Sequence, residues 1–369
     1  MEKIKVLIIT GAMSIGGAEK VAADIGLYAD RTRYEIHYVS FDEPGGDYEA
    51  ELQNAGCTVF HFPQPSDSFH AYVQHLRELI ATYHYDVIHA HTMFNIGWAM
   101  LAGRLGGVPV RVAHSHSALR EHRILKVRVY ESMMHLLIRG CATDWIGCSV
   151  DAGNRLYGEP FFRRRGQLIL NGVDTAAFAY RETARQKMRR ELGMEDCFVI
   201  GHVGHLAEVK NQAFLLDRMP DILKKRPDAR LLLLGEGPDR AMLEDKIQSL
   251  GLEQAVTMTG NVRNVSDYLS AMDVFAFPSL YEGMPLSIVE VQSNGLPCVI
   301  STGVPEDVVL TDLIHPLPLD RPEDWVETIC GCTRSADASR YAGQMRESGF
   351  DTRTAMEKIY QIYDKAEKK

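Results

Sequence analysis

The sequence lacks three patterns, each of which would point to a definite class of protein. It has no Cys-x-x-Cys pair and its seven cysteines form an odd set, so we expect reduced, buried thiols rather than a disulfide framework. No stretch fits G-x-G-x-x-G, the pattern typical of dinucleotide-binding loops, because Met13 and Arg240 stand where glycines would be needed. The sequence therefore does not favour a nicotinamide-dependent dehydrogenase. No apolar run approaches the ~18 residues that a membrane span needs, which predicts a cytoplasmic location.

Length and charge narrow the protein class further. At 369 residues the chain exceeds the roughly 250–300 at which one hydrophobic core stops growing, which predicts two domains. Its 46% hydrophobic and 24% charged residues are typical of a soluble α/β protein. The net charge of −9 argues against a general nucleic-acid-binding protein. Residues 1–172 hold 17 basic and 18 acidic side chains, so most of the negative charge lies in the second half.

Short apolar strands alternate with helical patterns along both halves of the chain, which predicts parallel, doubly wound sheets. The expected strands are 5–10, 34–41, 58–62, 87–92, 110–116, 143–149, 167–171, 198–204, 230–235, 256–259, 274–278 and 298–301. A glycine turn at Asn171 predicts the boundary between domains 1–172 and 173–351, with Asp174 capping a short turn that leads to Phe178. Residues 352–369 are expected to form an amphipathic helix with Ile359 on its apolar side.

The stretch with the most specific pattern runs from Leu280 to Glu290, where Glu282 and Glu290 are separated by seven residues. The preceding apolar strand stops at Pro278, because proline cannot donate to a β-ladder, and Pro285 suits the first turn of a helix. Glu282 is therefore expected on a strand-to-helix loop and Glu290 within the helix. In an open parallel sheet such loops bind ligands, and the N–H groups of the helix start favour an anion such as a nucleotide diphosphate.

An isolated pair at this spacing is more often two solvated charges, but further motifs accompany it in a set order. They are Gly16-Gly17, His114, the Asn171 linker, Lys210, Gly235-x-Gly237, Glu282 and Glu290. Together they resemble the retaining glycosyltransferases of family 4, and the resemblance covers almost the whole chain. It implies the GT-B fold, in which two Rossmann-like, doubly wound parallel-sheet domains face a central cleft and the C-terminal helix packs back on the first. His114-Ser-His116, followed by a basic stretch, looks most like the branch acting in capsular and exopolysaccharide biosynthesis.

The resemblance implies roles in binding a nucleoside diphosphate sugar, above all a UDP-sugar. Glu282 would contact the donor sugar, Glu290 the ribose and Lys210 the phosphates, with Glu282, Lys210 and His114 as the catalytic residues. The other expected donor-binding residues are Gly16, Gly17, His205, Gly283, Met284, Pro285 and Leu286. The family pattern G-R-x4-K-N has an arginine where this chain has His205. Histidine lacks the bidentate fork of arginine, which leaves the strength of donor binding open.

No cofactor or metal is expected. Metal-dependent transferases often hold Mg²⁺ or Mn²⁺ with an Asp-x-Asp pair, which occurs nowhere in this chain, so positive side chains and helix starts must stabilise the leaving diphosphate. His89, His91, His114 and His116 end two strands that should be neighbours, and alternate residues of a strand face the same way, so four imidazoles could converge on a metal. Because no cysteine or carboxylate completes a familiar ligand set, histidines lining a cleft are the favoured interpretation.

A basic stretch follows the second pair of histidines. Its basic residues are Arg120, Arg123, Lys126, Arg128 and Arg139. Its apolar residues Leu125, Val129, Met133 and Leu136 form a helical stripe that we expect to pack inward. A solvated helix face is one interpretation. With His116 beside it, and with Arg163, Arg164 and Arg165, the stretch could instead form an acceptor or membrane surface that meets anionic lipid or a lipid pyrophosphate.

The sequence therefore predicts a metal-independent, retaining hexosyltransferase whose acceptor is a saccharide, expected to be lipid-linked, with peripheral contact at the inner face of the plasma membrane. The second domain would bind the donor and the first would offer the acceptor surface. Two alternatives remain open. A GT-B sugar-nucleotide epimerase would need no acceptor, and a non-catalytic partner would have a weakened donor site. Lys210, Glu282 and Glu290 argue against the non-catalytic alternative, whereas His205 argues for it.

Overall fold

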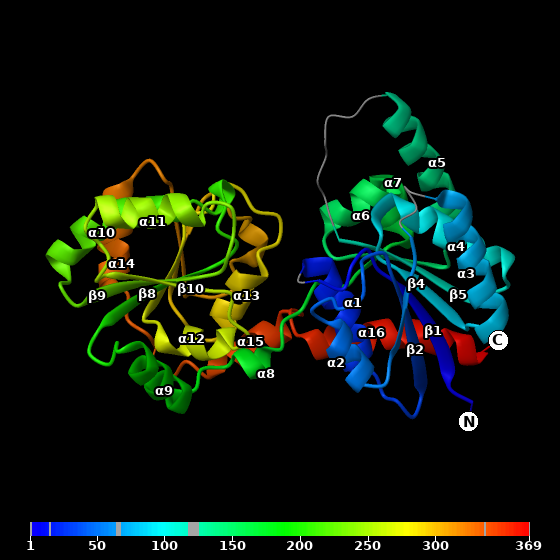
Figure 1. Cartoon of the computed structure of the whole chain (residues 1–369), viewed down its shortest axis with the longest axis horizontal. Helices are drawn as coiled ribbons and strands as arrows, with labels where there is room; N and C mark the ends of the chain where they lie inside the picture. The colour runs from blue at the N-terminus through cyan, green and yellow to red at the C-terminus, as the bar shows by residue number, and fades with distance from the viewer. Residues whose placement is uncertain (1, 15, 64–67, 117–124, 336, 369) are drawn as a thin grey trace. The chain divides into compact units, whose positions relative to one another are not determined.

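The computed structural model describes residues 2–14, 16–63, 68–116, 125–335 and 337–368. The chain divides into two compact units, the first made of residues 1–172 and 352–369 and the second of residues 173–351. Each unit is a parallel β-sheet with helices on both faces (Figure 1). The α/β, GT-B-type pair of doubly wound sheets is the fold expected from the sequence.

The sheet of the first unit runs in the order β3-β2-β1-β4-β5-β6-β7, with all strands parallel. The bounds are β1 Ile4–Ile9, β2 Tyr34–Ser40, β3 Thr58–His61, β4 Val87–Ala90, β5 Val110–Ser115, β6 Asp144–Gly147 and β7 Gln167–Leu168. The order changes direction between β1 and β4, which pair directly. These strands are apolar on both faces, as a parallel sheet covered by helices on both sides requires.

Helices cover both faces of this sheet. One face packs against α1 (Gly17–Leu27), α2 (Glu49–Asn54) and α16 (Thr352–Tyr363). The other packs against α3 (Phe69–Tyr83), α4 (Ile96–Leu105), α5 (Leu125–Cys141), α6 (Val150–Tyr157) and α7 (Glu159–Arg165). Short 3-10 turns stand at η1 (Met93–Asn95) and η4 (Asp364–Lys368). Because Ile359 and Tyr363 of α16 are fully buried in the core of this sheet, the C-terminal helix completes the first unit, as expected.

The sheet of the second unit runs in the order β10-β9-β8-β11-β12-β13 and is also parallel. The bounds are β8 Phe198–Val203, β9 Ala229–Leu234, β10 Val256–Gly260, β11 Val274–Phe277, β12 Cys298–Ser301 and β13 Ile314–Leu317. The order changes direction between β8 and β11. Strand β13 was not predicted from the sequence, because the segment contains Pro316. Proline is tolerated in a strand chiefly at a sheet edge, and β13 is an edge strand.

The helices of the second unit again divide between the two faces. One face packs against α10 (Gln212–Lys225), α11 (Arg240–Ser249) and α14 (Pro322–Gly331), and the other against α12 (Val265–Ala271) and α13 (Leu286–Ser293). The remaining elements are α8 (Thr175–Phe178), α9 (Glu182–Leu192), α15 (Arg340–Glu347), η2 (Glu208–Lys210) and η3 (Glu306–Val308). Asp174 caps α8 as predicted, because its side chain accepts the N–H of Ala177 at 2.9 Å.

The apolar stripe of α5 does not pack inward, contrary to the prediction from the sequence. Leu125 is 73% exposed, Val129 62% and Leu136 70%. The buried side of the helix is formed by Met134 and Ile138 instead. The face of α5 that carries Met134 and Ile138 is buried because α4 has Gly97 opposite it. A Cβ atom at Gly97 would lie only 2.8 Å from Sδ of Met134, so the absence of a side chain lets the two helices approach closely there. The first turns of α5 stand clear of the rest of the unit (Figure 1).

The observed burial of α5 predicts that truncating two nearby side chains of this helix changes the free energy of unfolding by very different amounts. Ile138→Ala should lower the free energy of unfolding by about 2–5 kcal/mol, since it empties a fully buried site. Leu136→Ala should change it by no more than about 0.5 kcal/mol, because its side chain is already in water. Urea unfolding of both variants checks this. A larger loss in Leu136→Ala than in Ile138→Ala would restore the inward-packing stripe.

Candidate functional site

The candidate site of the second unit lies where its strand order changes direction. In open α/β sheets ligands bind outside the carboxyl ends of the strands at such a switch point. Here β8 and β11 are neighbours. The loop after β8 ends in η2, whose last residue is Lys210, and the loop after β11 carries Glu282. The topology therefore brings together two residues that are 72 positions apart in sequence.

Lys210 and Glu282 form an ion pair at this point. Nζ of Lys210 lies 2.6 Å from Oε1 of Glu282, and the two side chains are only 19% and 11% exposed. The same ammonium lies 5.1 Å from the ring centroid of Phe277, the last residue of β11, within reach of a cation–π interaction. Salt in solution screens a shielded pair of this kind less than a surface pair. Two predicted catalytic residues thus hold each other in place.

Hydrogen bonds between the loops fix the position of this pair. The N–H of Leu280 donates to the carbonyl of Val209 at 2.8 Å, which ties the loop after β11 to the loop after β8. Asn211 has a left-handed backbone with φ of 54°, a conformation that asparagine tolerates better than most residues. Its side-chain amide donates to the carbonyl of Pro278 at 3.2 Å. The main chain of both loops therefore determines where the ammonium and the carboxylate meet.

His202, which the sequence analysis passed over, supports the loop that carries Lys210. It lies in β8 and is fully buried. Its Nδ1–H donates to the carbonyl of Ala276 at 3.0 Å, and its Nε2 accepts from the side-chain amide of Gln212 at 3.2 Å, so the ring is neutral. Burial lowers the pKa of His202 to about 4; the hydrogen bond to Ala276 opposes this shift and Lys210 adds to it. A polar residue inside an apolar strand is the signal that could have revealed it.

The glycines after β9 pack against the same loop. Gly235 has φ of +133°, and a Cβ atom there would lie 2.1 Å from the carbonyl oxygen of Gly204. At Gly237 a Cβ atom would lie 2.3 Å from the carbonyl oxygen of Leu206. Only glycine fits at these positions. The close approach fixes the loop on which His205 presents an exposed side chain.

Helix α13 begins immediately beyond Glu282. Pro285 is its N-cap in an extended conformation and makes no side-chain capping bond, so the first N–H groups of the helix are placed to stabilise an anion. Gly283 is exposed, and a Cβ atom there would meet nothing within 4 Å. Met284 and Leu286 are half-buried on either side of Pro285. Glu290 is half-buried and lies within the helix, as predicted.

The first unit has its own switch point between β1 and β4. Helix α1 begins at Gly17, with Gly16 as an extended N-cap. A Cβ atom at Gly16 would lie 2.2 Å from Oε2 of Glu19, whereas the space beside Gly17 is open. The two glycines therefore leave the main chain at the start of an 11-residue helix open to approach.

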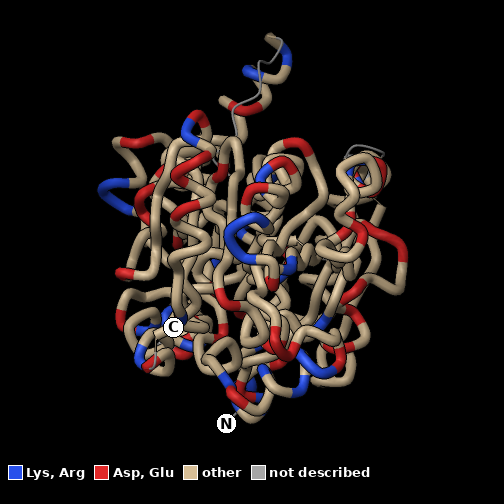
Figure 2. The backbone as a smooth tube through the Cα atoms, turned by 90° about the vertical axis from the view of Figure 1, so that its left-hand side faces the viewer, with Lys and Arg blue, Asp and Glu red and all other residues tan. Residues whose placement is uncertain are grey.

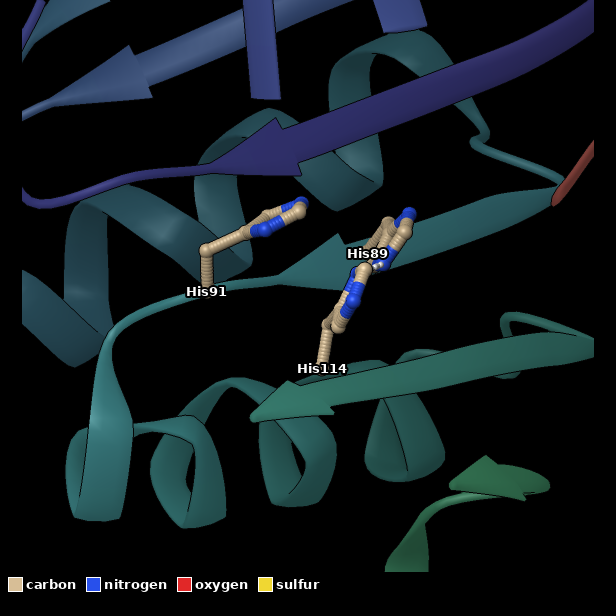
Figure 3. A group of neighbouring side chains, drawn as sticks. All are labelled: His89, His91 and His114. Carbon is tan, nitrogen blue, oxygen red and sulfur yellow. Dashed lines mark hydrogen bonds between the residues drawn. The ribbon is translucent and has the colours of Figure 1, made fainter. Parts of the chain in front are cut away.

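Four histidines gather at the ends of β4 and β5. His89 and His91 come from the first strand, His114 and His116 from the second, and Figure 3 shows the rings of His89, His91 and His114 turned toward one another. Nε2 of His89 lies 3.2 Å from Nδ1 of His114, and Nδ1 of His91 lies 2.7 Å from Nε2 of His116. The hydroxyl of Tyr363 in α16 lies 2.7 Å from Nδ1 of His89. The four imidazoles therefore lie together, which the sequence allowed but did not favour, and His89, His91 and His114 are buried rather than lining an open cleft.

These imidazoles are neutral at physiological pH because the protein buries them. His89 is 0%, His114 1% and His91 5% exposed. Burial lowers the pKa of His89 to about 3 and that of His116 to about 4. Burial also holds the pKa of His91 and of His114 well below the ordinary value, and neighbouring imidazoles add to that effect. Catalytic roles for His114 and His116 as cations are therefore unfavourable.

The predicted basic surface is described only in part. Arg120 and Arg123 lie outside the described residues. Lys126 is exposed in the first turn of α5, and Figure 2 marks Lys and Arg positions along the backbone of this projecting segment. Arg163, Arg164 and Arg165 are exposed in the last turn of α7, a position favoured for cations by the helix dipole. No helix among the described residues is both long and apolar enough to cross a bilayer.

Comparison with known proteins places these features in a family. The profile described as "Glycosyltransferase Family 4" matches residues 15–177, and that described as "Glycosyl transferases group 1" matches residues 197–334. The chain is 31% identical to EpsF of Bacillus subtilis strain 168, described as a glycosyltransferase, over 98% of this chain and 96% of EpsF.

A second relative and a solved structure extend the comparison. The chain is 30% identical to an Escherichia coli UDP-Gal:alpha-D-GlcNAc-diphosphoundecaprenol alpha-1,3-galactosyltransferase, over 61% of this chain and 60% of the relative. The fold of the present chain is similar to that of Anabaena HepE, whose crystal structure was solved in complex with UDP. The TM-score is 0.76 and the identity 22%, over 98% of this chain and 99% of HepE.

The buried His202 predicts a measurable dependence of stability on pH. Its pKa is about 4 in the folded chain and about 6.5 in an unfolded one. Between these values the unfolded state binds the proton more readily, so stability is present above pH 6.5 and is lost as pH falls toward 4. Between pH 7.5 and 5 the wild type should lose about 2 kcal/mol more than His202→Gln.

Urea unfolding at pH 7.5 and pH 5 makes this comparison. His315→Gln serves as the control, because His315 is exposed in the same unit, and it should keep the wild-type difference between the two pH values. Equal pH dependence in wild type and His202→Gln would show that His202 is not held neutral by the fold.

Proposed function

Because the chain belongs to glycosyltransferase family 4, we propose that it transfers a hexose from a nucleoside diphosphate sugar, with retention of configuration and without a metal ion. CapH of Staphylococcus aureus, 24% identical over 98% of this chain, is described as a capsular polysaccharide biosynthesis glycosyltransferase, and a UDP-sugar is the proposed donor. The observation that carries this proposal is the shielded ion pair between Lys210 and Glu282 at the switch point of the second unit.

The chemistry requires a positive charge where the diphosphate leaves. As the anomeric C–O bond breaks, the sugar becomes oxocarbenium-like and negative charge grows on the phosphates, which a preorganised cation can stabilise. Lys210 supplies that cation, and the N–H groups at the start of α13 supply a second source of positive potential. His205, exposed on the loop after β8, adds a contact where the family pattern has arginine. These groups replace the divalent ion that an Asp-x-Asp pair would hold.

The ion pair also suggests how donor binding proceeds. Without donor, Glu282 neutralises Lys210 at 2.6 Å. An incoming diphosphate offers the ammonium a second anion, so Lys210 can pass from the carboxylate to the phosphates. Glu282 is then free to accept hydrogen bonds from the hydroxyls of the sugar, while Glu290, further along the chain within α13, accepts from the ribose. In this scheme Lys210 and Glu282 become available to the phosphates and the sugar only when donor is bound.

The acceptor is proposed to be a saccharide carried on a lipid diphosphate. The name of the Escherichia coli relative describes such an acceptor. In this chain the apolar side chains of α5 are exposed in the same helix as Lys126 and Arg128, and the basic end of α7 belongs to the same unit. Apolar and basic side chains together suit the surface of an anionic bilayer. We therefore propose peripheral contact through α5, with no span of the membrane.

Transfer in the presence of EDTA tests the proposed chemistry. With a UDP-hexose and a synthetic lipid-diphosphate saccharide, the wild type should form a glycoside that keeps the donor's anomeric configuration, read by NMR after the first turnover. Lys210→Ala and Glu282→Ala should each lower kcat by about 10²–10³. The controls are Lys246→Ala and Asp217→Ala, which break a more exposed ion pair of 2.8 Å in the same unit and should transfer normally.

Each alternative function gives a different result in this assay. An epimerase would convert the nucleotide sugar without acceptor, and a non-catalytic partner would form no product with any donor. Loss of turnover that Mn²⁺ or Mg²⁺ restores would refute metal independence, and an inverted anomer would refute retention. Undiminished transfer by folded Lys210→Ala would remove Lys210 from the mechanism.

Flotation with liposomes tests the membrane contact of α5. Burying a leucine side chain is worth about 1.5–3 kcal/mol, so Leu125→Gln with Leu136→Gln should weaken binding to anionic vesicles at least tenfold. Leu105→Gln is the matched control, because Leu105 is 74% exposed in α4 of the same unit. Equal flotation of all three proteins, or equal binding to neutral and anionic vesicles, would reject α5 as the contact surface.

A further inference from the structure

The histidines of the first unit form a cluster that the proposed transfer chemistry does not use. One ring nitrogen from each of His89, His91 and His114 lies within 4.8 Å of those of the other two (Figure 3). All three side chains are at least nine-tenths buried. They stand on the face of the sheet that packs against α1 and α16, since His89 pairs in register with Ile8 and Val112, both of that core. Ordinarily an aliphatic side chain would occupy such positions.

Two ring nitrogens of this cluster are left without hydrogen-bond partners. Among the described residues, neither Nε2 of His91 nor Nε2 of His114 has one. Leaving a buried donor or acceptor unsatisfied destabilises the folded state, and such groups usually indicate a bound ion, a water or a catalytic role. Two of them in one cluster make a shared ligand a simpler explanation than two independent defects.

The partners of the other ring nitrogens orient the lone pairs. Tyr363 holds Nδ1 of His89 at 2.7 Å, and His116 holds Nδ1 of His91 at 2.7 Å. In metal sites the second nitrogen of a ligating imidazole is engaged in this way by an oxygen or another polar group, which fixes the ring. In both residues it is Nε2 that remains for a ligand. Nε2 of His89 now contacts Nδ1 of His114 at 3.2 Å, a hydrogen bond that a bound ion would replace.

We propose that His89, His91 and His114 bind one transition-metal ion of borderline softness, of which Zn²⁺ is the representative. Three imidazoles suit Zn²⁺, Co²⁺, Ni²⁺ or Cu²⁺, whereas Mg²⁺ and Mn²⁺ prefer oxygen ligands. Tetrahedral bonds of about 2.0–2.1 Å place nitrogen ligands about 3.3 Å apart, so the rings need to close by about 1.5 Å at most.

The charge of such an ion has a counterpart nearby. Asp24 of α1, 2% exposed, lines the same narrow void as His114, and its carboxylate also pairs with Lys20. A divalent cation with three neutral ligands needs compensation of this kind in a buried setting. The carboxylate lies beyond the ligands and so serves the ion electrostatically.

The ion would join three separate parts of the first unit. His89 lies in β4 and His91 just beyond its end, His114 lies in β5, and Tyr363 ties α16 to the ligand His89. Binding would therefore stabilise the return of the C-terminal helix onto the sheet. The groups proposed to stabilise the diphosphate lie in the second unit, so metal binding is measured on different residues from those that the transfer assay tests. Failure of the metal site and failure of the proposed transfer are thus separate outcomes.

Titration of the metal-free full-length protein with Co²⁺ and Zn²⁺ tests the site. Co²⁺ should give the intense visible absorption of a tetrahedral ion at one equivalent per chain, and Zn²⁺ should displace it and raise Tm. His91→Gln and His114→Gln should each abolish the one-equivalent Co²⁺ spectrum. Tyr363→Phe should keep the spectrum but weaken binding by about 10–100-fold. His75→Gln should behave as wild type, because His75 is exposed on α3 of the same unit.

The outcomes decide between a site and a set of buried histidines. No tetrahedral Co²⁺ spectrum in the wild type, or the same spectrum in His91→Gln and His114→Gln, would overturn the proposal. So would an equal loss in His75→Gln, which would indicate adventitious binding at the surface. Should His114→Gln fail to fold, His91→Gln and Tyr363→Phe still decide, since wild-type affinity in both contradicts the site.

Discussion

The ion pair between Lys210 and Glu282 is the interaction on which the account of this protein depends. Taking an ammonium and a carboxylate out of water is costly, and removing one partner of such a pair leaves an uncompensated charge. The fold holds this pair because β8 and β11, far apart in sequence, are neighbours in the sheet, and because the loops that follow them are hydrogen-bonded to each other. The strand order of the doubly wound sheet therefore determines where the two charged groups lie.

The same topological rule acts in the first unit, with different chemistry. There the residues at the carboxyl ends of β4 and β5 are imidazoles, and the alternation of side chains along a strand turns His89, His91 and His114 toward one face. That face is covered by α16, so these polar side chains occupy the interior and take partners from one another and from Tyr363. The switch point of the second unit presents paired opposite charges, whereas the strand ends beside the switch point of the first unit present neutral imidazoles.

Much of the fold and part of the site could be predicted from the sequence, and the misses have physical causes. Short apolar segments ended by glycine or proline predicted the β-strands except β13. That strand contains Pro316, which is tolerated because β13 lies at the edge of its sheet. The exposed side of α5 could not be predicted, because the helix carries two apolar stripes and only the approach of α4 at Gly97 decides between them.

The residues of the site divide in the same way. The motifs identified Lys210 and Glu282 individually, but sequence spacing does not encode their 2.6 Å contact; it depends on which strands are neighbours. His202 stands out in the sequence only as a polar residue in an apolar strand, and its partners Ala276 and Gln212 follow from the fold and not from sequence spacing. The basic residues Arg120 and Arg123 lie outside the described residues, so their predicted surface role stays a prediction.

The exchange of Lys210 from Glu282 to the donor phosphates is the central claim, and calorimetric binding of UDP tests it most directly. UDP has the diphosphate but no sugar, so it should need Lys210 and compete with Glu282. Lys210→Ala should weaken UDP binding by about 1.5–3 kcal/mol, the value of a charge-assisted contact, while Glu282→Ala should bind UDP as tightly as wild type or more tightly. If folded Glu282→Ala loses as much affinity as Lys210→Ala, or if neither variant changes it, the two residues do not exchange partners as described.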